Sequence, residues 1–441
     1  MTQKRKAAAK ATGLQSAAAP LALVGATLVE LVPARVRRVT IVVDNGQIAA
    51  LTDTPPAGAT VLDCAGLTVM PGFACAHTHL YSALARGMPA PRERPANFSQ
   101  ILERVWWKLD RALDAELIEL SALVGALEAA HAGTTTLVDH HASPAFIDGS
   151  LDLVAGALEQ VGLRGVLCYE VSDRGGPDEA RAGVRENDRF LAKRAASPSP
   201  LLRGLVGAHA AFTLSDATAE QLADVAIRHQ VGVHIHVAED AIDTRKNGLP
   251  VTTWLDKRGL LGPRALLAHC VHLGDDEVAQ VRAAGARVVH NPRSNANNAV
   301  GYARPSRYGE LAMLGTDGIG ADMRAEAHAA FLAAAEHHDG LDAVAALERS
   351  RAYAGWHFGH GVAVEPGAPA DLVALDYRSP TPLDTGNLGG HLLFGLASAS
   401  VRHVVVAGRV VLRDGRSPDL DEEAIYARAR EAAKRLWARL Q

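Results

Sequence analysis

The 441-residue sequence has few cysteines, few aromatic residues and no long apolar run. Its four cysteines (Cys64, Cys75, Cys168 and Cys270) are scattered and form no CxxC pair. This argues against a disulfide framework or a thiolate zinc site and fits a reducing cytoplasm. No stretch approaches the roughly 20 apolar residues that a membrane span needs. We therefore expect a cytoplasmic protein with no membrane partner.

The sequence also lacks the charge and aromatic content of a nucleic-acid binding protein. Its formal net charge is -4 and its aromatic content is 5%, so no nucleic-acid partner is expected. Residues 1–20 are basic and alanine-rich, without the apolar core of a signal peptide. We interpret them as a disordered leader, and a nucleic-acid arm is the weaker alternative.

Both ends of the remaining chain are rich in predicted β-strands. Residues 21–70 include Asn45-Gly46, a two-residue hairpin signal between β-branched runs. Residues 361–418 contain further Val-rich runs and a turn at Ala407-Gly408. A last helix is expected at about 420–440, where the apolar residues follow helical spacing.

The middle of the chain alternates between apolar runs and segments with helical periodicity. Eight runs occur: LTVMPGFACAHTH, TTTLVDHH, LRGVLCYEV, LLRGLVGAHA, VGVHIHVAED, ALLAHCV, ARVVHNP and LAMLGTDG. Several are continuous Val, Leu and Ile, as in strands buried on both faces. This alternation predicts an α/β fold, a (β/α)8 TIM barrel, with extra helices in the long stretch 80–133.

Nearly every one of these runs ends in a residue capable of chemistry. The endings are His77 and His79, Asp139-His140-His141, Glu170, His209, His236 with Glu239, His269, His290-Asn291, and Asp317. In a (β/α)8 barrel the carboxyl ends of the strands form the active-site face. The sequence therefore predicts that these side chains gather at the mouth of the barrel.

Four of these residues form a plausible metal site. Residues i and i+2 of a strand point to the same side, so His77 and His79 present two imidazoles to one point. His236 and Asp317 complete a set of three histidines and one aspartate, which suits zinc and also iron(II), manganese or cobalt. His234 could replace His236, but His236 is preferred because Glu239 follows it by three residues.

The pattern His77-x-His79, His236-x-x-Glu239, His269 and Asp317 resembles the amidohydrolase superfamily, in its mononuclear deaminase and chlorohydrolase branch. The segments FSQILERVWWKLDRAL, DHHASP and NPRSNANNAVGY are most similar to SsnA-type putative aminohydrolases, and DHH also resembles 8-oxoguanine deaminases. The resemblance implies a barrel at 71–360, a β-sandwich made from 21–70 and 361–418, and a C-terminal helix at 419–441. It also implies a single divalent metal ion, zinc or alternatively iron(II), held by the four ligands above.

The resemblance also implies roles for the remaining residues. Asp317 would accept the proton of the attacking water, Glu239 would protonate the ring and the departing amine, and His269 would orient the nucleophile. His209 is expected to bond the substrate ring. His141 could reach the pocket, in which case His140 would point outward.

The leading hypothesis is a metal-dependent aminohydrolase that deaminates a purine, pterin or related heterocycle and releases ammonia. One alternative keeps the site but removes chloride or an alkylamine from a triazine-like ring. Another is a non-catalytic metal-binding scaffold. The resemblance also favours a homo-oligomer, a dimer or larger.

Overall fold

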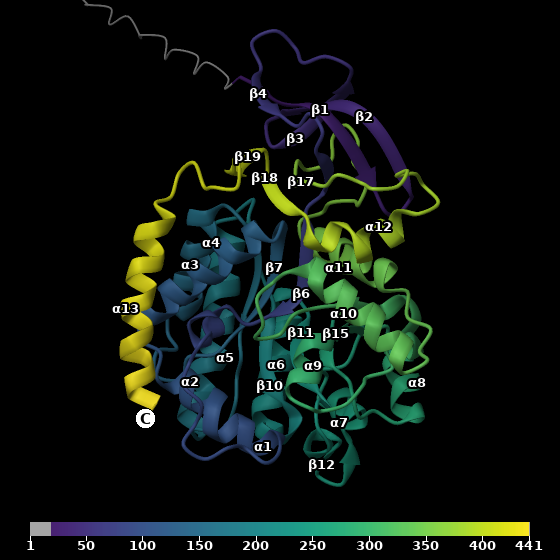
Figure 1. Ribbon diagram of the computed structural model, residues 1–441. Coiled ribbons are helices and arrows are strands. Elements are labelled where there is room, and N and C mark those ends of the chain that lie inside the picture. The colour runs from purple at the N-terminus through teal and green to yellow at the C-terminus, as the bar shows by residue number, and fades with distance from the viewer. Residues whose placement is uncertain (1–18, 441) are drawn as a thin grey trace, which may run out of the picture.

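A computed structural model describes residues 19–440, so the predicted leader at 1–20 lies almost wholly outside the described part of the chain. Eight parallel strands form the centre of the molecule (Figure 1). They are β6 (Phe73–Thr78), β7 (Thr134–His141), β8 (Arg164–Tyr169), β10 (Val206–Ala210), β11 (Val233–Val237), β14 (Leu266–His269), β15 (Arg287–His290) and β16 (Ala312–Leu314). Each corresponds to one of the eight apolar runs of the sequence.

The barrel strands are hydrogen-bonded as two parallel sheets. One has the order β6-β7-β8-β9, where β9 is Leu202–Gly204, and the other has the order β10-β11-β14-β15-β16. Parallel bridges between Val171 and Ala208 and between Thr78 and Asp317 join the two sheets at both edges. The strands therefore follow one another around a ring, as the barrel prediction requires.

Helices surround this ring. The larger ones are α3 (Ala115–His131), α4 (Ser150–Val161), α5 (Pro177–Ala196), α6 (Asp216–His229), α7 (Val251–Lys257), α8 (Asp275–Ala284), α10 (Met323–Glu336) and α11 (Ala343–His357). Helix α6 shows why they form. Ser215 caps its first turn by accepting from Thr218 N, and Leu222 and Val225 are buried on one face.

Side chains from several strands fill the inside of the barrel. One buried apolar cluster includes Ala76 of β6, Val138 of β7, Val166 of β8, Leu266 of β14 and Val289 of β15. The interior is thus a packed floor beneath the mouth, not a pore.

Strands from both chain ends pair in one eight-stranded sheet. They are β1 (Leu21–Glu30), β2 (Arg35–Asp44), β3 (Gln47–Thr52), β4 (Thr60–Asp63), β5 (Thr68–Pro71), β17 (Leu372–Asp376), β18 (Ser400–Val406) and β19 (Arg409–Leu412). The order is β19-β18-β17-β5-β1-β2-β3, with β4 also on β1. The expected two layers are thus hydrogen-bonded into one continuous sheet. Asn45 and Gly46 both have positive φ at the predicted hairpin turn.

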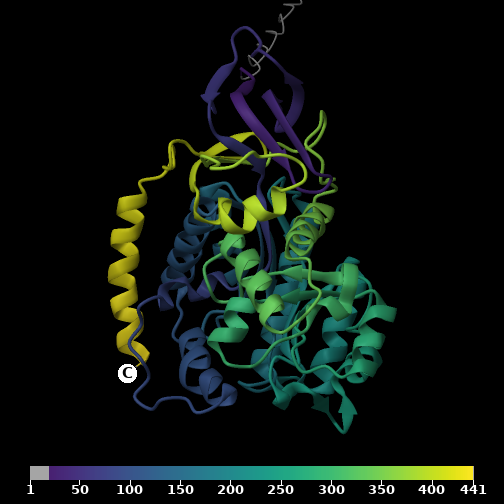
Figure 2. The ribbon, with the colours of Figure 1, turned by 45° about the vertical axis from the view of Figure 1, so that its right-hand side comes forward.

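The sheet and the barrel meet at Gly72, between β5 and β6. A Cβ atom there would lie 2.3 Å from the Thr135 side chain, so only glycine fits. Arg164 of the barrel pairs with Asp371 beside β17 at 2.6 Å. Figures 1 and 2 show the sheet at one end of the barrel and α1 (Phe98–Ile101) and β12 (Arg245–Lys246) at the other. The predicted boundaries between the two units stay a prediction.

The C-terminal helix α13 (Glu422–Leu440) lies against α3 (Figure 1). Ile425, Ala429, Ala432 and Leu436, which follow the predicted helical spacing, are all buried. The Trp437 indole N–H donates to the carbonyl of Leu84 at 2.9 Å, which connects this helix to the segment after β6.

The insertion between β6 and β7 contains the extra helices expected at 80–133. They are η1 (Leu80–Ala85), α1 (Phe98–Ile101), η2 (Leu102–Trp106), α2 (Trp107–Arg111) and α3, and α1, η2 and α2 follow one another without a break. The remaining short elements are η3 (Ala211–Thr213), η4 (Ala241–Asp243), β12 (Arg245–Lys246), β13 (Leu249–Pro250), α9 (Pro292–Asn297), η5 (Pro305–Leu311), α12 (Leu388–Phe394) and η6 (Leu396–Ser398).

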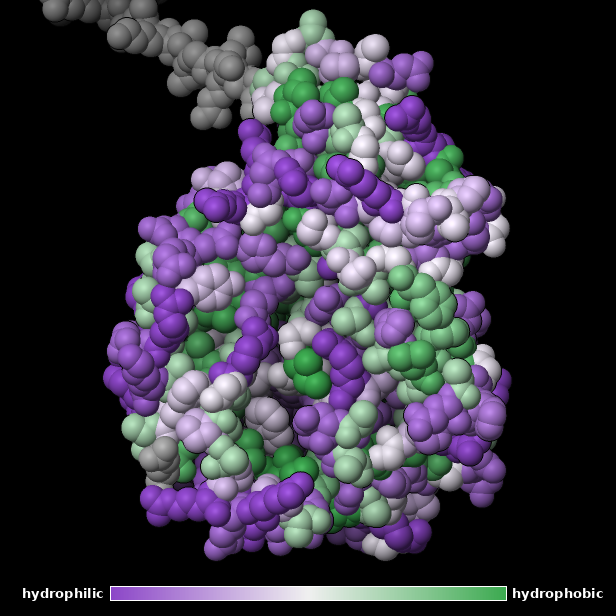
Figure 3. All heavy atoms as spheres, viewed as in Figure 1, coloured by the Kyte–Doolittle hydropathy of each residue, from purple (hydrophilic) through white to green (hydrophobic). Residues whose placement is uncertain are grey.

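Hydrophilic side chains cover much of the face shown in Figure 3. Among the described residues, no helix combines the length and the apolar character required to cross a lipid bilayer.

Candidate active site

The four predicted metal ligands come together at the carboxyl ends of the barrel strands. His79 Nε2 lies 3.2 Å from His236 Nε2 and 2.9 Å from Asp317 Oδ1. His77 Nε2 lies 3.2 Å from the same carboxylate oxygen. An ion held tetrahedrally at 2.0–2.1 Å from its ligands separates them by about 3.3 Å, so the spacing suits a small cation.

The second ring nitrogen of two of these histidines fixes which nitrogen faces the site. His79 Nδ1 lies 2.6 Å from the carbonyl of His140, and His236 Nδ1 lies 2.9 Å from the carbonyl of His209. A carbonyl only accepts, so both Nδ1 atoms donate, and each neutral ring keeps its lone pair on Nε2. Two lone pairs then face each other across 3.2 Å, and a positive charge between them removes the repulsion. The donor set therefore fits a metal cation.

The pKa values of these groups also indicate a site that requires a positive charge. Burial lowers the pKa of His77 to about 3 and the pKa of His236 well below its usual value, so both rings are neutral. Burial opposes a charge on His79, yet the Asp317 carboxylate raises the pKa of His79 to about 9. Against the effect of burial, hydrogen bonds with His77 and His79 hold the pKa of Asp317 well below its ordinary range. A proton on His79 thus occupies the position of a cation, and metal uptake should release it.

Asp317 is positioned by the turn after β16. Its backbone has φ 53°, a left-handed conformation that is unusual for a residue other than glycine. Its second carboxylate oxygen accepts a hydrogen bond from the hydroxyl of Ser294. One oxygen therefore faces the histidines while the other is held by α9.

Two further histidines approach the same point. The ligand atoms of His77, His236, His269 and Asp317 lie within 4.8 Å of one another, and so do those of His77, His79, His140 and His236. His140 Nε2 lies 3.2 Å from the carbonyl of His234, whereas its Nδ1 lies 3.2 Å from Glu170 without forming a hydrogen bond. His269 Nε2 likewise has no hydrogen-bond partner within the described chain.

Glu239 and His269 stand beside the four ligands. Glu239 Oε2 lies 3.6 Å from His269 Nε2, and its other oxygen lies 3.4 Å from the Asn298 amide nitrogen. Burial raises the pKa of Glu239 to about 7. A carboxyl group of this kind can give and take a proton near neutral pH.

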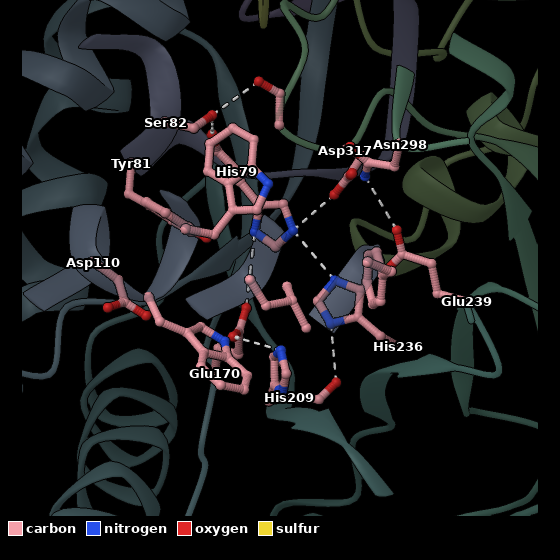
Figure 4. Close-up of a pocket in the computed structure, with 15 residues that line it drawn as sticks. His79, Tyr81, Ser82, Asp110, Glu170, His209, His236, Glu239, Asn298 and Asp317 are labelled. Atoms are coloured by element: carbon pink, nitrogen blue, oxygen red, sulfur yellow. Dashed lines mark hydrogen bonds and ion pairs between the residues drawn. The ribbon is translucent and has the colours of Figure 1, made fainter. Parts of the chain in front are cut away.

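A pocket opens over these groups (Figure 4). Its walls are His79, Tyr81, Ser82, Phe98, Leu102, Trp106, Trp107, Asp110, Glu170, His209, His236, Glu239, Asn298, Asp317 and Gly318. Figure 4 shows Glu239, Asn298 and Asp317 on one side of His79 and His236, and Asp110, Glu170 and Tyr81 on the other.

The structure separates the two predicted substrate contacts. His209 lines the pocket, where its Nδ1 lies 2.7 Å from the Thr213 hydroxyl and its Nε2 lies 3.8 Å from Glu170. His141 does not line it, and its Nε2 bonds the hydroxyl of Ser143 at 2.9 Å. His140, expected to point outward, instead packs among the site histidines with its ring centre 4.8 Å from that of His236. The expected orientations of His140 and His141 were therefore wrong, because His140 faces the site and His141 does not line the pocket.

Several wall residues were not assigned from the sequence. Trp106 and Trp107 both line the pocket. Glu170 is buried, and His209 and His140 keep its pKa well below the usual range despite the effect of burial. The position of Glu170 at the end of the third apolar run was the feature of the sequence that could have indicated its place in the pocket. Tyr81, Trp106 and Trp107 lie in the insertion between β6 and β7. This insertion contains no barrel strand, so no strand end in the sequence indicated that these side chains would face the pocket.

Similarity to known proteins agrees with this geometry. The chain matches the amidohydrolase family over residues 68–411. It belongs to the amidohydrolase family. The 5'-deoxyadenosine deaminase of Methanothermobacter thermautotrophicus is 30% identical over 420 residues, covering 91% of this chain and 95% of that protein. The 5-methylthioadenosine/S-adenosylhomocysteine deaminase of Pelotomaculum thermopropionicum is 30% identical, with 85% and 87% covered.

Two solved structures of amidohydrolases share the fold. A zinc-bound adenosine deaminase from Xanthomonas campestris has a TM-score of 0.81 at 24% identity, covering 95% of this chain and 98% of that one. The zinc complex of an atrazine chlorohydrolase from Arthrobacter aurescens has a TM-score of 0.77 at 20% identity, covering 94% and 100%. The predicted TIM-barrel fold and the predicted hydrolase acting on carbon–nitrogen bonds are confirmed. The scaffold alternative therefore has no support.

Proposed function

We propose that this amidohydrolase replaces an exocyclic amino group of a purine-like or related heterocycle by oxygen and releases ammonia. The observation that carries the proposal is the meeting of three imidazole nitrogens and a carboxylate beside the largely buried carboxyl group of Glu239. The relatives that are about 30% identical over most of the chain are named as deaminases of adenosine-type nucleosides, which favours ammonia over chloride as the leaving group.

His77, His79, His236 and Asp317 would hold one divalent cation. Zinc suits three neutral imidazoles and one carboxylate, and iron(II) is the alternative. Such a cation supplies the Lewis acidity that makes water nucleophilic near neutral pH.

The protein's own residues move the protons. Asp317 takes a proton from the attacking water, and His269 Nε2, which has no partner among the described residues, accepts the other O–H and orients the oxygen. Glu239 donates a proton to the ring nitrogen next to the attacked carbon. Glu239 then takes the remaining proton of the attacking oxygen and passes it to the amino group. The carbon–nitrogen bond breaks, ammonia leaves, and the ring keeps the oxygen as a lactam. The proton held by Asp317 finally restores Glu239.

Substrate binding would use the wall opposite Glu239. The faces of Trp106 and Trp107 suit a flat ring, and His209 Nε2 is available to bond a ring atom beside Glu170. His141 does not line the pocket and has no substrate contact in this proposal.

A panel of heterocycles tests the proposal. Adenosine-type nucleosides, free aminopurines, aminopterins and chlorinated triazines are incubated with the zinc-loaded enzyme, and released ammonia and chloride are measured separately. Ammonia from a purine or pterin with stoichiometric zinc is the expected result. Chloride release alone would favour the triazine alternative, and release of neither would overturn both.

Finer assignments belong to the same proposal. The likeness to SsnA-type aminohydrolases, a homo-oligomeric state and a cytoplasmic location remain proposals. The last is supported by four buried cysteines without a disulfide in the described residues.

A further inference from the structure

His234 belongs to the histidine pair of β11, but the proposed chemistry uses only His236. His234 is fully buried one step deeper in the barrel. Its Nε2 lies 2.8 Å from Nδ1 of His77, with the two rings nearly perpendicular at 74°. This is hydrogen-bond distance between two histidines in the packed interior.

The direction of this hydrogen bond follows from the metal site. His77 must keep its Nε2 lone pair to bind a cation, so its neutral ring carries the proton on Nδ1. That proton can only be accepted by the Nε2 lone pair of His234. His234 then carries its own proton on Nδ1, which faces Cys168 Sγ at 3.7 Å, and the Cys168 thiol lies 3.5 Å from the carbonyl of Asp139.

His77 therefore differs from the two other histidine ligands. His79 and His236 each donate Nδ1–H to a backbone carbonyl, which no side-chain substitution removes. The acceptor for His77 is a side chain. Acceptors of this kind fix the ring orientation and raise the basicity of a ligand, and their loss typically weakens metal binding 10–100-fold.

We propose that His234 is a positioning residue of the metal centre: it accepts the Nδ1 proton of His77 and so fixes the tautomer in which His77 binds the cation. Cys168 extends the same chain by accepting from His234. The inference depends on the proposed metal site but not on the identity of the substrate.

Replacement of His234 by residues with and without an acceptor tests the inference. His234→Leu fills space but leaves the buried Nδ1–H of His77 unpaired, and zinc affinity should fall about 10–100-fold. His234→Gln presents a carbonyl oxygen near the position of Nε2, and its zinc affinity should stay within about threefold of wild type. Dissociation constants come from competition with a chromophoric chelator, and the visible spectrum of the cobalt(II) form reports ligand geometry.

His290→Leu is the matched control. His290 is also buried, on strand β15, which is separated from β11 by β14, but its ring nitrogens have no hydrogen-bond partner within residues 19–440. This variant should bind zinc as the wild type does. If His234→Leu does not fold by circular dichroism, His234→Asn replaces it, because its shorter side chain does not reach His77.

The possible outcomes separate this inference from the proposed function. Equal zinc affinity in all His234 variants, or equal loss in the Gln and Leu variants, overturns the role of the acceptor while leaving the metal site intact. A wild-type protein that binds no stoichiometric zinc, iron or cobalt overturns the metal site itself. A weakened Leu variant with a rescued Gln variant supports the inference.

Discussion

The metal-binding side of the pocket stands on barrel strands, whereas the aromatic side stands on the insertion between β6 and β7. His77, His79, His236 and Asp317 come at or just after strand ends, and carbonyls of neighbouring strands hold two of the rings. Phe98, Leu102, Trp106 and Trp107 come from the continuous helical run formed by α1, η2 and α2.

This difference separates the chemistry of the pocket from its specificity. Strand ends in a barrel are fixed by the ladder of backbone hydrogen bonds, so they keep ligand atoms within a few tenths of an ångström. A wall carried by an insertion outside the barrel strands can change in shape without disturbing that ladder. Changes to the metal ligands on the strand side should therefore remove metal and turnover, and changes on the insertion side should alter substrate binding alone.

The largest effect is expected for Asp317→Asn. The amide loses the negative charge that compensates the cation while keeping the size of the side chain. Stoichiometric metal should be lost at micromolar concentrations, and kcat/KM should fall at least about 1000-fold. Metal analysis after dialysis and steady-state kinetics measure both. A variant that retains its metal and its rate would contradict the assignment of Asp317.

Glu239→Gln should separate catalysis from metal binding on the strand side. Glutamine keeps the contacts with Asn298 and His269 but cannot exchange a proton. A fall of about 100- to 10,000-fold in kcat is expected, with metal content unchanged. Metal loss comparable to that of Asp317→Asn would show that Glu239 is structural instead.

Trp107→Ala probes the insertion side. Loss of an indole face should raise KM about tenfold, while the metal content stays at the wild-type value. Trp356→Ala on α11 is the control, because Trp356 is 55% exposed and lies outside the pocket walls. If Trp107→Ala also lost its metal, the two sides of the pocket would not be independent.

The smallest effect concerns stability and pH in the metal-free protein. The pKa of Glu239 is raised from its ordinary value of 4.5 to about 7, so its favourable contribution is complete below pH 4.5 and is lost as pH rises through 7. Glu239→Gln removes this titration. Between pH 5 and pH 8.5 the free energy of unfolding of the wild type should therefore fall relative to that of Glu239→Gln. This relative change should be at most about 3 kcal/mol.

Urea unfolding at both pH values measures this difference. Glu365→Gln, which replaces an exposed carboxylate, is the control and should show no such difference from the wild type. An unchanged difference between wild type and Glu239→Gln would mean that the carboxyl group is not held neutral by burial.

The sequence by itself determined the barrel, its eight strands and the catalytic residues worth testing. Continuous apolar runs bury both faces of a strand, and a polar residue after each run must lie where the buried run ends. That is why His77, His79, His236 and Asp317 could be grouped although 240 positions separate the first from the last.

Tertiary structure alone decided which way the DHH segment faces, what holds each imidazole and what forms the pocket wall. The face of His140 depends on the register of β7 against β6, which shifts twice along the pair. The partner of His77 depends on a contact between β6 and β11, which lie across the barrel from each other. Such contacts arise from closure of the ring, and no local pattern in the chain encodes them.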